Sequence, residues 1–158
     1  PSPVRYGNVV YCTSGYRGSA IFAIPLDSTG DITGTAKIAW HSDRDTPYVP
    51  SPLLYGDMLY FTKSNLAVLS CLNAKTGESI LSATRLPGLN NLYASPVGAA
   101  DRIYITARDG ATLVLRRSPQ FEVLATNKLD DPIDASPAIA GKQLFLRGHK
   151  HLYCIEAP

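Results

Sequence analysis

The sequence predicts an all-β fold made of one unit that is repeated four times. Apolar and polar residues alternate with a period of two, and almost no stretch shows the longer periodicity of a helix. The dipeptide Ser-Pro opens each unit, at prolines that are 49, 44 and 41 residues apart: Pro3, Pro52, Pro96 and Pro137. Because helices are missing, helical solenoids are excluded. Four short antiparallel strands in a unit of about 40 to 45 residues are typical of a β-propeller blade.

Two further marks recur in phase with the prolines. Four residues after each proline comes a turn position, where glycine adopts positive φ at no steric cost: Gly7, Gly56, Ala100 and Gly141. Eight residues after each proline comes an aromatic residue: Tyr11, Tyr60, Tyr104 and Phe145. An ordinary β-sandwich gives no reason for the same marks to return four times in phase. The pattern therefore favours a propeller over a sandwich.

A third apolar strand and an outer strand complete the unit. The third strands read AIFAIPL, LAVLSCL, TLVLR and HLYCI, and the first three outer strands read KIAWHS, SILSATRL and FEVLATNKL. The fourth unit stops after its third strand. We expect a single β-propeller domain or partial propeller over 1–158, with repeats at 1–49, 50–93, 94–134 and 135–158, the last of them incomplete.

The strand count predicts part of a larger ring. Pro1 falls on the opening of a unit, and the last unit lacks an outer strand. We expect the C-terminal part of a propeller with about seven or eight blades. For this chain alone, the expected alternatives are a closed ring of four blades and self-association into a two-fold assembly, because an open half exposes apolar faces.

Composition excludes several classes of function. Charged residues make up 18% of the chain and the net charge is +2, without a basic patch, so nucleic acid is not an expected partner. No run approaches the roughly 18 consecutive apolar residues of a membrane-spanning helix, so no transmembrane segment is expected. The cysteines lie far apart in apolar runs, which predicts free thiols: Cys12, Cys71 and Cys154.

The repeat resembles a known family. The run SPLLYGDMLYFT, followed by LAVLSCLNAKTGE and an outer strand, is similar to the pyrroloquinoline-quinone-like (PQQ-like) β-propeller repeat. The likeness extends over the whole chain and is best in the second repeat, where Thr76 and Gly77 match the Thr-Gly turn of that family. The first repeat departs most, because DSTGDITGTAK replaces the short turn.

The resemblance implies two kinds of function. One is a non-catalytic scaffold, similar to the lipoprotein propeller that helps to assemble outer-membrane proteins in bacteria. The other is a quinone-dependent dehydrogenase that holds PQQ and calcium in its central channel. This sequence lacks the adjacent-cysteine pair of those dehydrogenases, and Trp40 is its only tryptophan where that family uses several to lock the blades.

We therefore predict a binding or scaffolding module with a protein or peptide partner and no cofactor. By resemblance it acts in the bacterial cell envelope, in the periplasm or otherwise outside the cytoplasm. A fragment of a PQQ dehydrogenase, with PQQ and calcium as cofactors, is the first alternative. An extracytoplasmic sensor domain of a signalling protein is the second.

No catalytic or metal-binding motif appears. GxSxG, HExxH, P-loop and GxGxxG are all missing, so no catalytic residue is predicted. His149 and His151 straddle a turn without a third ligand nearby, which predicts solvated turn residues rather than a metal site. The acidic run LDDPID, 129–134, is interpreted as ordinary turn chemistry.

Binding is expected in the connectors that lead from the outer strand of one unit to the Ser-Pro of the next. These connectors lie on one face of a propeller, and loops on a rigid scaffold commonly carry binding sites. Tyrosines just before Ser-Pro add amphipathic rings that suit contact with a protein. The predicted binding residues are Asp43, Arg44, Asp45, Tyr48, Asn90, Asn91, Tyr93, Asp130, Asp131 and Asp134.

Overall fold

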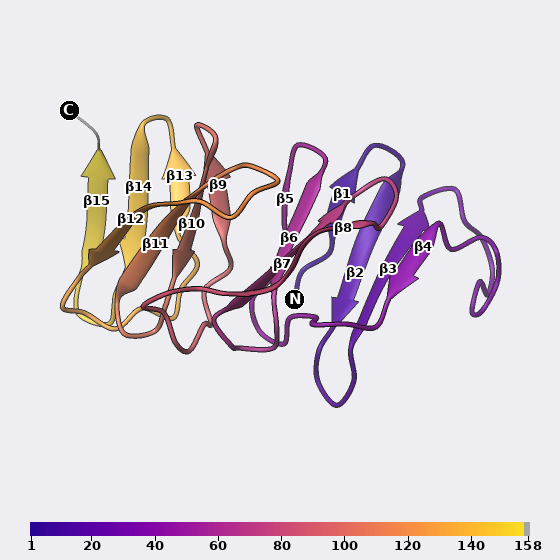
Figure 1. Cartoon of the computed structure of the whole chain (residues 1–158), viewed down its shortest axis with the longest axis horizontal. Coiled ribbons are helices and arrows are strands. Elements are labelled where there is room, and N and C mark those ends of the chain that lie inside the picture. The colour runs from indigo at the N-terminus through magenta and orange to yellow at the C-terminus, as the bar shows by residue number, and fades with distance from the viewer. Residues whose placement is uncertain (157–158) are drawn as a thin grey trace.

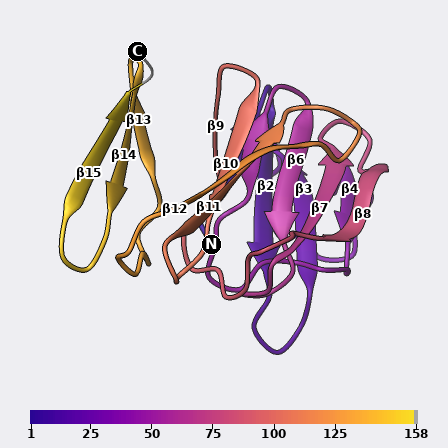
Figure 2. The same cartoon turned by 60° about the vertical axis from the view of Figure 1, so that its left-hand side comes forward.

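The computed structural model describes residues 1–156, which contain fifteen strands and no helix. The strands form four antiparallel sheets, three of four strands and one of three, as predicted. Figures 1 and 2 show the sheets following one another in chain order, so the fold is an all-β propeller type. No helix of the described part is long and apolar enough to cross a membrane. Residues 157 and 158, the end of the predicted fourth repeat, lie outside the described residues.

Each sheet is built in chain order from its innermost strand outward. The first sheet contains β1 (Val4–Tyr6), β2 (Val9–Ser14), β3 (Ala20–Pro25) and β4 (Trp40–Ser42). The second contains β5 (Leu53–Tyr55), β6 (Met58–Thr62), β7 (Val68–Asn73) and β8 (Ser79–Arg85). The third contains β9 (Val97–Ala99), β10 (Arg102–Thr106), β11 (Ala111–Arg116) and β12 (Val123–Lys128). The fourth contains β13 (Ala138–Ala140), β14 (Gln143–Arg147) and β15 (Leu152–Glu156).

The inner hairpins turn at the predicted positions. Gly7, Gly56 and Gly141 have φ of 57°, 64° and 58°, with only the first central residue of the turn at positive φ, as in a type II′ turn. Ala100 and Asp101 have φ of 49° and 55°, the pattern of a type I′ turn. The one unit without glycine therefore still makes the turn, at a steric cost to both side chains.

The Ser-Pro openings have a structural role that the spacing alone did not explain. From the second unit on, each serine side chain accepts a hydrogen bond from the backbone N–H of the serine one unit earlier. The bonds run from Ser2 N to Ser51 Oγ (2.8 Å), from Ser51 N to Ser95 Oγ (2.9 Å) and from Ser95 N to Ser136 Oγ (2.9 Å). The innermost strands are thus joined by one chain of serines, and the following proline fixes φ there.

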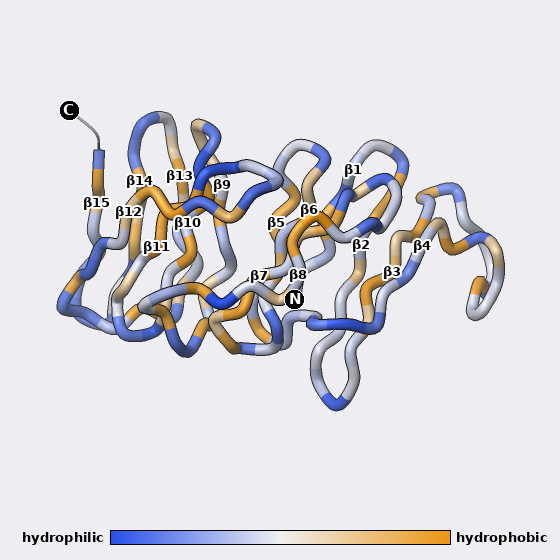
Figure 3. Tube along the Cα trace, in the orientation of Figure 1, coloured by the Kyte–Doolittle hydropathy of each residue, from blue (hydrophilic) through white to orange (hydrophobic). Residues whose placement is uncertain are grey.

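Each sheet has a forward face, toward the next sheet of the chain, and a backward face, toward the preceding one. The aromatic marks lie on forward faces. Tyr11 packs against the second sheet and donates its hydroxyl to Ala74 O over 2.8 Å. Tyr60 packs against Ile103 and Ile105 of the third sheet. The core therefore lies in the seams between sheets, and Figure 3 shows hydrophobic colour along the inner strands and hydrophilic colour in many turns.

The four sheets form an open arc. The innermost strands of neighbouring sheets contact each other (β1 with β5, β5 with β9, β9 with β13), but within residues 1–156 β1 does not meet β13. The first and fourth sheets stand at opposite ends of the molecule (Figure 1). The expected closed ring of four blades is therefore wrong for a single chain, and the backward face of the first sheet and the forward face of the fourth are left uncovered.

Candidate functional site

The three connectors lie on the same edge of the arc as the turns between the second and third strands of each sheet. In a sheet whose strands run alternately up and down, both kinds of loop must come to the same edge. We call this surface the connector face; it consists of residues 43–52, 86–96 and 129–137 from the connectors and 15–19, 63–67, 107–110 and 148–151 from the turns. The turns β2–β3 and β14–β15 mark it at the lower edge of Figure 1.

Backbone hydrogen bonds hold each connector against the turn of the following sheet. Each seam has one such bond in the same place: Ser64 N–H to Thr46 O (2.8 Å), Arg108 N–H to Asn91 O (3.0 Å) and His149 N–H to Pro132 O (2.9 Å). The same joint is therefore repeated at all three seams. The connectors present their side chains from a fixed backbone rather than from free loops.

Asp131 fastens the third connector to the fourth sheet from inside. The residue is 1% exposed, and its carboxylate accepts the backbone N–H groups of Lys150 and His151 (3.1 and 3.0 Å) and the hydroxyl of Tyr153 (3.2 Å). A Cβ at Gly148 would lie 2.2 Å from this carboxylate, so glycine is required there. Burial raises the pKa of Asp131, but the hydrogen bonds outweigh it and hold the pKa below its ordinary value. Asp131 was predicted to bind a partner, but in the structure its carboxylate is buried and binds the fourth sheet.

A row of polar side chains crosses the seams between the second, third and fourth sheets. The guanidinium of Arg108 lies over the ring of Tyr93, with Cζ 4.1 Å from the centroid. The same guanidinium pairs with both oxygens of Asp134, and Oδ2 of Asp134 is 3.2 Å from His149 Nε2. The bond from Arg108 is the main cause that lowers the pKa of Asp134. Since the side chains of Arg108 and Asp134 are each over a third exposed, the pair contributes little to stability and stays accessible to solvent.

A second group of side chains lies over the first seam. The rings of Tyr16 and Tyr48 stack with centroids 5.2 Å apart and planes at 23°, and Arg17 Cζ lies 5.2 Å from the Tyr16 centroid. Tyr16 is 60% exposed and Tyr48 41% exposed, and Val49 and Leu66 nearby are also exposed. We call these five residues the aromatic platform. Contiguous large apolar side chains on a surface mark an interaction site more often than isolated ones do.

The structure places the ten predicted binding residues in different environments. Tyr48 belongs to the aromatic platform, and Tyr93 and Asp134 meet through Arg108. Asp131 is buried, as described above. Asp45 is half-buried and pairs with Lys63 over 2.9 Å. The remaining five are exposed on the connectors: Asp43, Arg44, Asn90, Asn91 and Asp130.

The aromatic platform and the polar row contain six residues that were not predicted: Tyr16, Arg17, Val49, Leu66, Arg108 and His149. Val49 lies in a connector, and the other five lie in turns between second and third strands, which the sequence pattern indicates only as polar turns. The signal was present, because in a meandering sheet these turns must share an edge with the connectors. Arg108 and His149 then become partners of Asp134.

The acidic third connector does not fit a calcium site. Calcium takes about six to eight oxygen ligands, whereas Asp131 is saturated by the fourth sheet and Asp134 by Arg108 and His149. Only Asp130 of the three carboxylates is left to a ligand. Within residues 1–156, no three His, Cys, Asp or Glu side chains are grouped as metal ligands. The residues of this connector therefore do not supply the calcium site that a bound quinone of the dehydrogenase type requires.

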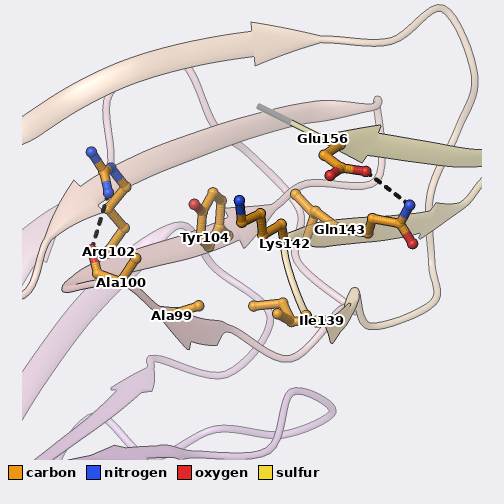
Figure 4. Close-up of a pocket in the computed structure, with 10 residues that line it drawn as sticks. Ala99, Ala100, Arg102, Tyr104, Ile139, Lys142, Gln143 and Glu156 are labelled. Atoms are coloured by element: carbon orange, nitrogen blue, oxygen red, sulfur yellow. Dashed lines mark hydrogen bonds between the residues drawn. The ribbon is translucent and has the colours of Figure 1, made fainter. Parts of the chain in front are cut away.

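A hollow of about 700 Å³ lies at the opposite edge of the arc, between the third and fourth sheets. Figure 4 shows it, with Gln143 Nε2 donating to Glu156 Oε2 over 2.9 Å and Arg102 Nη1 donating to Ala100 O over 3.0 Å. Tyr104, the aromatic mark of the third sheet, lines it from the forward face. None of the predicted binding residues lines this hollow, and several of its polar groups are already paired.

Comparison with solved structures identifies the fold. No family model matches the sequence, and no curated protein does either. BamB from Moraxella catarrhalis superimposes with a TM-score of 0.67 at 17% identity, over 95% of this chain and 43% of that chain. The chain has a BamB-like β-propeller fold.

Two computationally designed proteins are also similar. Ika4 has a TM-score of 0.72 at 10% identity over 99% of this chain and 89% of its own. Ika8 has a TM-score of 0.69 at 9% identity over 98% of this chain and 45% of its own. The present chain thus spans less than half the length of BamB and of Ika8. At these identities the likeness concerns the fold alone.

Proposed function

We propose that this chain is a non-catalytic binding module that holds a protein partner on its connector face. The observation that carries the proposal is the aromatic platform, in which stacked Tyr16 and Tyr48 stand exposed beside Arg17. Tyrosine and arginine are among the residues most enriched at the energetic centres of protein interfaces. The tyrosine rings give a large contact area at a low cost in side-chain entropy.

The platform is prepared for binding because its backbone is already fixed. Ser64 N–H donates to Thr46 O over 2.8 Å, and Val49 N–H donates to Asn65 Oδ1 over 3.2 Å. Thr46 Oγ1 also donates to Ser14 O over 2.7 Å, which ties the connector to the preceding sheet. Ordering these loops on binding therefore costs little, and the partner gains affinity from preorganisation.

Charge indicates the chemistry of the partner. Lys63 is paired with Asp45, so its charge is largely used within the protein. Arg17 and Arg44 are exposed on this part of the connector face, whereas Asp43 is the one exposed carboxylate of the first connector. The best complement is a protein segment with aliphatic or aromatic side chains flanked by carboxylates.

The proposal places the partner and the chain in the bacterial envelope. Its support is the resemblance of the repeats to PQQ-like propellers of the scaffolding kind, together with the BamB-like fold. A periplasmic setting and a role in outer-membrane assembly are part of this proposal.

A site-specific photocrosslinker tests it. The crosslinking residue is placed at Tyr48 and, as a control, at Leu26, an exposed apolar residue that follows β3 beside Asn8, at the opposite edge. We expect a defined envelope protein to crosslink from Tyr48 and not from Leu26. The purified partner is then titrated against the wild type, the double variant Tyr16→Ala/Tyr48→Ala and Leu26→Ala.

The double variant should weaken binding by about 30-fold or more, since truncation of a central interface residue commonly costs about 2 kcal/mol. Leu26→Ala should bind like the wild type. Crosslinks that are equal from both edges, or a double variant that binds unchanged, would overturn the proposal.

A further inference from the structure

We propose that two copies of this chain associate head to tail into one closed ring of eight sheets. The forward face of the fourth sheet in each copy covers the backward face of the first sheet in the other. This inference does not depend on the binding partner of the connector face. It follows from the way in which the two uncovered end faces repeat the two halves of the internal seams.

The chain of serine hydrogen bonds leaves an unused donor at one end of the arc and an unused acceptor at the other. At the internal seams, a serine N–H meets the Oγ of the next serine, the last such bond being Ser95 N to Ser136 Oγ (2.9 Å). No other described residue accepts a hydrogen bond from Ser136 N or donates one to Ser2 Oγ. A donor thus stands free at one end and an acceptor at the other. Between two copies they form the same bond a fourth time.

The forward face of the fourth sheet repeats the forward face of the second. In the second sheet this face presents Tyr60 and its cross-strand partner Cys71, with Leu69 two residues before Cys71, and all three are buried against the third sheet. In the fourth sheet, Phe145 pairs with Cys154 in the same register. Leu152 follows at the position of Leu69 and is 70% exposed. An apolar half-seam therefore faces solvent at the end of the arc.

The backward face of the first sheet supplies the other half. In the second sheet, Leu59, Phe61 and Leu72 form the backward face and are buried against Tyr11 and its neighbours. In the first sheet, Val10 and Cys12 on β2 lie at the positions of Leu59 and Phe61, counted from the Ser-Pro proline. Ile24 on β3 pairs with Val10 and so lies at the position of Leu72. All three are apolar and partly exposed. Beside them, Phe22 is 37% exposed.

The curvature of the arc agrees with a ring of twice this length. The four sheets superimpose on 43% of the β-propeller BamB and on 45% of Ika8, with TM-scores of 0.67 and 0.69. Two copies therefore provide about the chain length of such a propeller. Because the contact joins unlike faces, closure of the ring limits the assembly to two copies, whereas imperfect closure would give open polymers.

Sedimentation equilibrium of the 158-residue chain between about 1 and 200 µM tests the association. We expect a dimer that dissociates on dilution and no larger species. Phe145→Arg and Val10→Asp each place a charge in the contact between the two copies and should give monomers. Their circular dichroism spectra should match that of the wild type, which shows that they are folded. Leu152→Arg is a second forward-face variant in case Phe145→Arg does not fold, and Leu66→Asp, on the connector face, should stay dimeric.

Mixing the variants identifies which faces meet. A ring made of one Phe145→Arg chain and one Val10→Asp chain contains one native seam and one seam that carries both substitutions. In that second seam the introduced arginine would face the introduced aspartate as an ion pair. The mixture should therefore recover the dimer that neither variant forms alone.

Monomeric wild type throughout the concentration range would overturn the inference. Polymers larger than the dimer would overturn it too. A mixture that stays monomeric would also overturn it, because the two substitutions restore a seam only if unlike faces meet.

Discussion

The indole Nε1 of Trp40 donates a hydrogen bond to the backbone carbonyl of Ala74 over 2.9 Å. The hydroxyl of Tyr11 donates to the same oxygen over 2.8 Å, so two side chains of the first sheet meet one carbonyl of the second. Gly77, in the same turn as Ala74, lies so close to the indole that a Cβ there would have no room. In the sequence, Trp40 stands alone where the PQQ dehydrogenases use several tryptophans to lock their blades. In the structure, Trp40 joins the first sheet to the second through its hydrogen bond to Ala74 O.

Replacement of Gly77 by alanine tests this lock. Gly77 has φ of 74°, and a Cβ there would lie 2.8 Å from the Trp40 ring. Left-handed geometry costs about 1 to 2 kcal/mol and overpacking about 1 to 3 kcal/mol, so Gly77→Ala should lower the free energy of unfolding by about 2 to 5 kcal/mol. Urea unfolding followed by tryptophan fluorescence gives the value.

Gly88→Ala is the matched control, because Gly88 has φ of 73° and open space around its Cα. It should cost only about 1 to 2 kcal/mol. Trp40→Ala should also make Gly77→Ala less costly, since the clash disappears. Equal costs for the two glycine changes would contradict the lock.

Tyr60 should matter for stability and not for binding. It is 2% exposed in the seam between the second and third sheets, so Tyr60→Ala should cost about 3 to 5 kcal/mol. Tyr48→Ala, on the surface, should cost about 0.5 kcal/mol or less. At a temperature where both variants are folded, the first should bind the partner normally and the second weakly. Loss of binding by Tyr60→Ala with unchanged stability would reverse this division of roles.

The turn of the third sheet should be improved by glycine. Ala100 is held at φ of 49°, where its Cβ is strained, so Ala100→Gly should raise the free energy of unfolding by about 0.5 to 1 kcal/mol after the entropy of the glycine is subtracted. Ala99→Gly, one residue earlier in β9, relieves no strain and should lower it by about 0.5 to 1 kcal/mol. Thermal unfolding of the two variants should move in opposite directions; shifts of the same sign would refute the explanation.

Acid should weaken the connector face. The pKa of Asp131 and that of Asp134 lie below the ordinary value of 3.8 in the folded chain, so each carboxylate stabilises the fold above about pH 4. This stabilisation is lost as the pH falls through the folded pKa values. The stability difference between wild type and Asp131→Asn should therefore shrink as the pH is lowered from about 7 to about 3.

Asp130→Asn, at an exposed position of the same connector, is the control for this effect. Its difference from wild type should stay small at every pH. A difference for Asp131→Asn that does not depend on pH would show that the pKa of Asp131 is the same in the folded and unfolded chain, and a difference that grows as the pH falls would show that folding raises it.

Much of the connector face was predictable in position but not in detail. The phase of the repeats places the connectors on one edge, and Tyr48, Tyr93 and Asp134 were named from it. Arg108, which joins Tyr93 to Asp134, was missed because it belongs to a different loop, about 15 residues from Tyr93 and 26 from Asp134. Contacts between loops at such separations leave no local pattern. For the same reason the sequence could not tell exposed Asp130 from buried Asp131.

The sequence by itself determined the strands, the turns and the four-fold repetition, because these depend on local properties: φ at Gly7 and Gly56, alternation along a strand, and an aromatic residue at a constant distance from each proline. Only the tertiary structure decided which contacts the repeated residues make. It showed that the Ser-Pro serines join neighbouring sheets, that Trp40 closes on Ala74, and that the arc stays open with two apolar end faces. Those outcomes depend on which surfaces meet across the seams, and burial between sheets is a property of the assembled chain rather than of any segment of it.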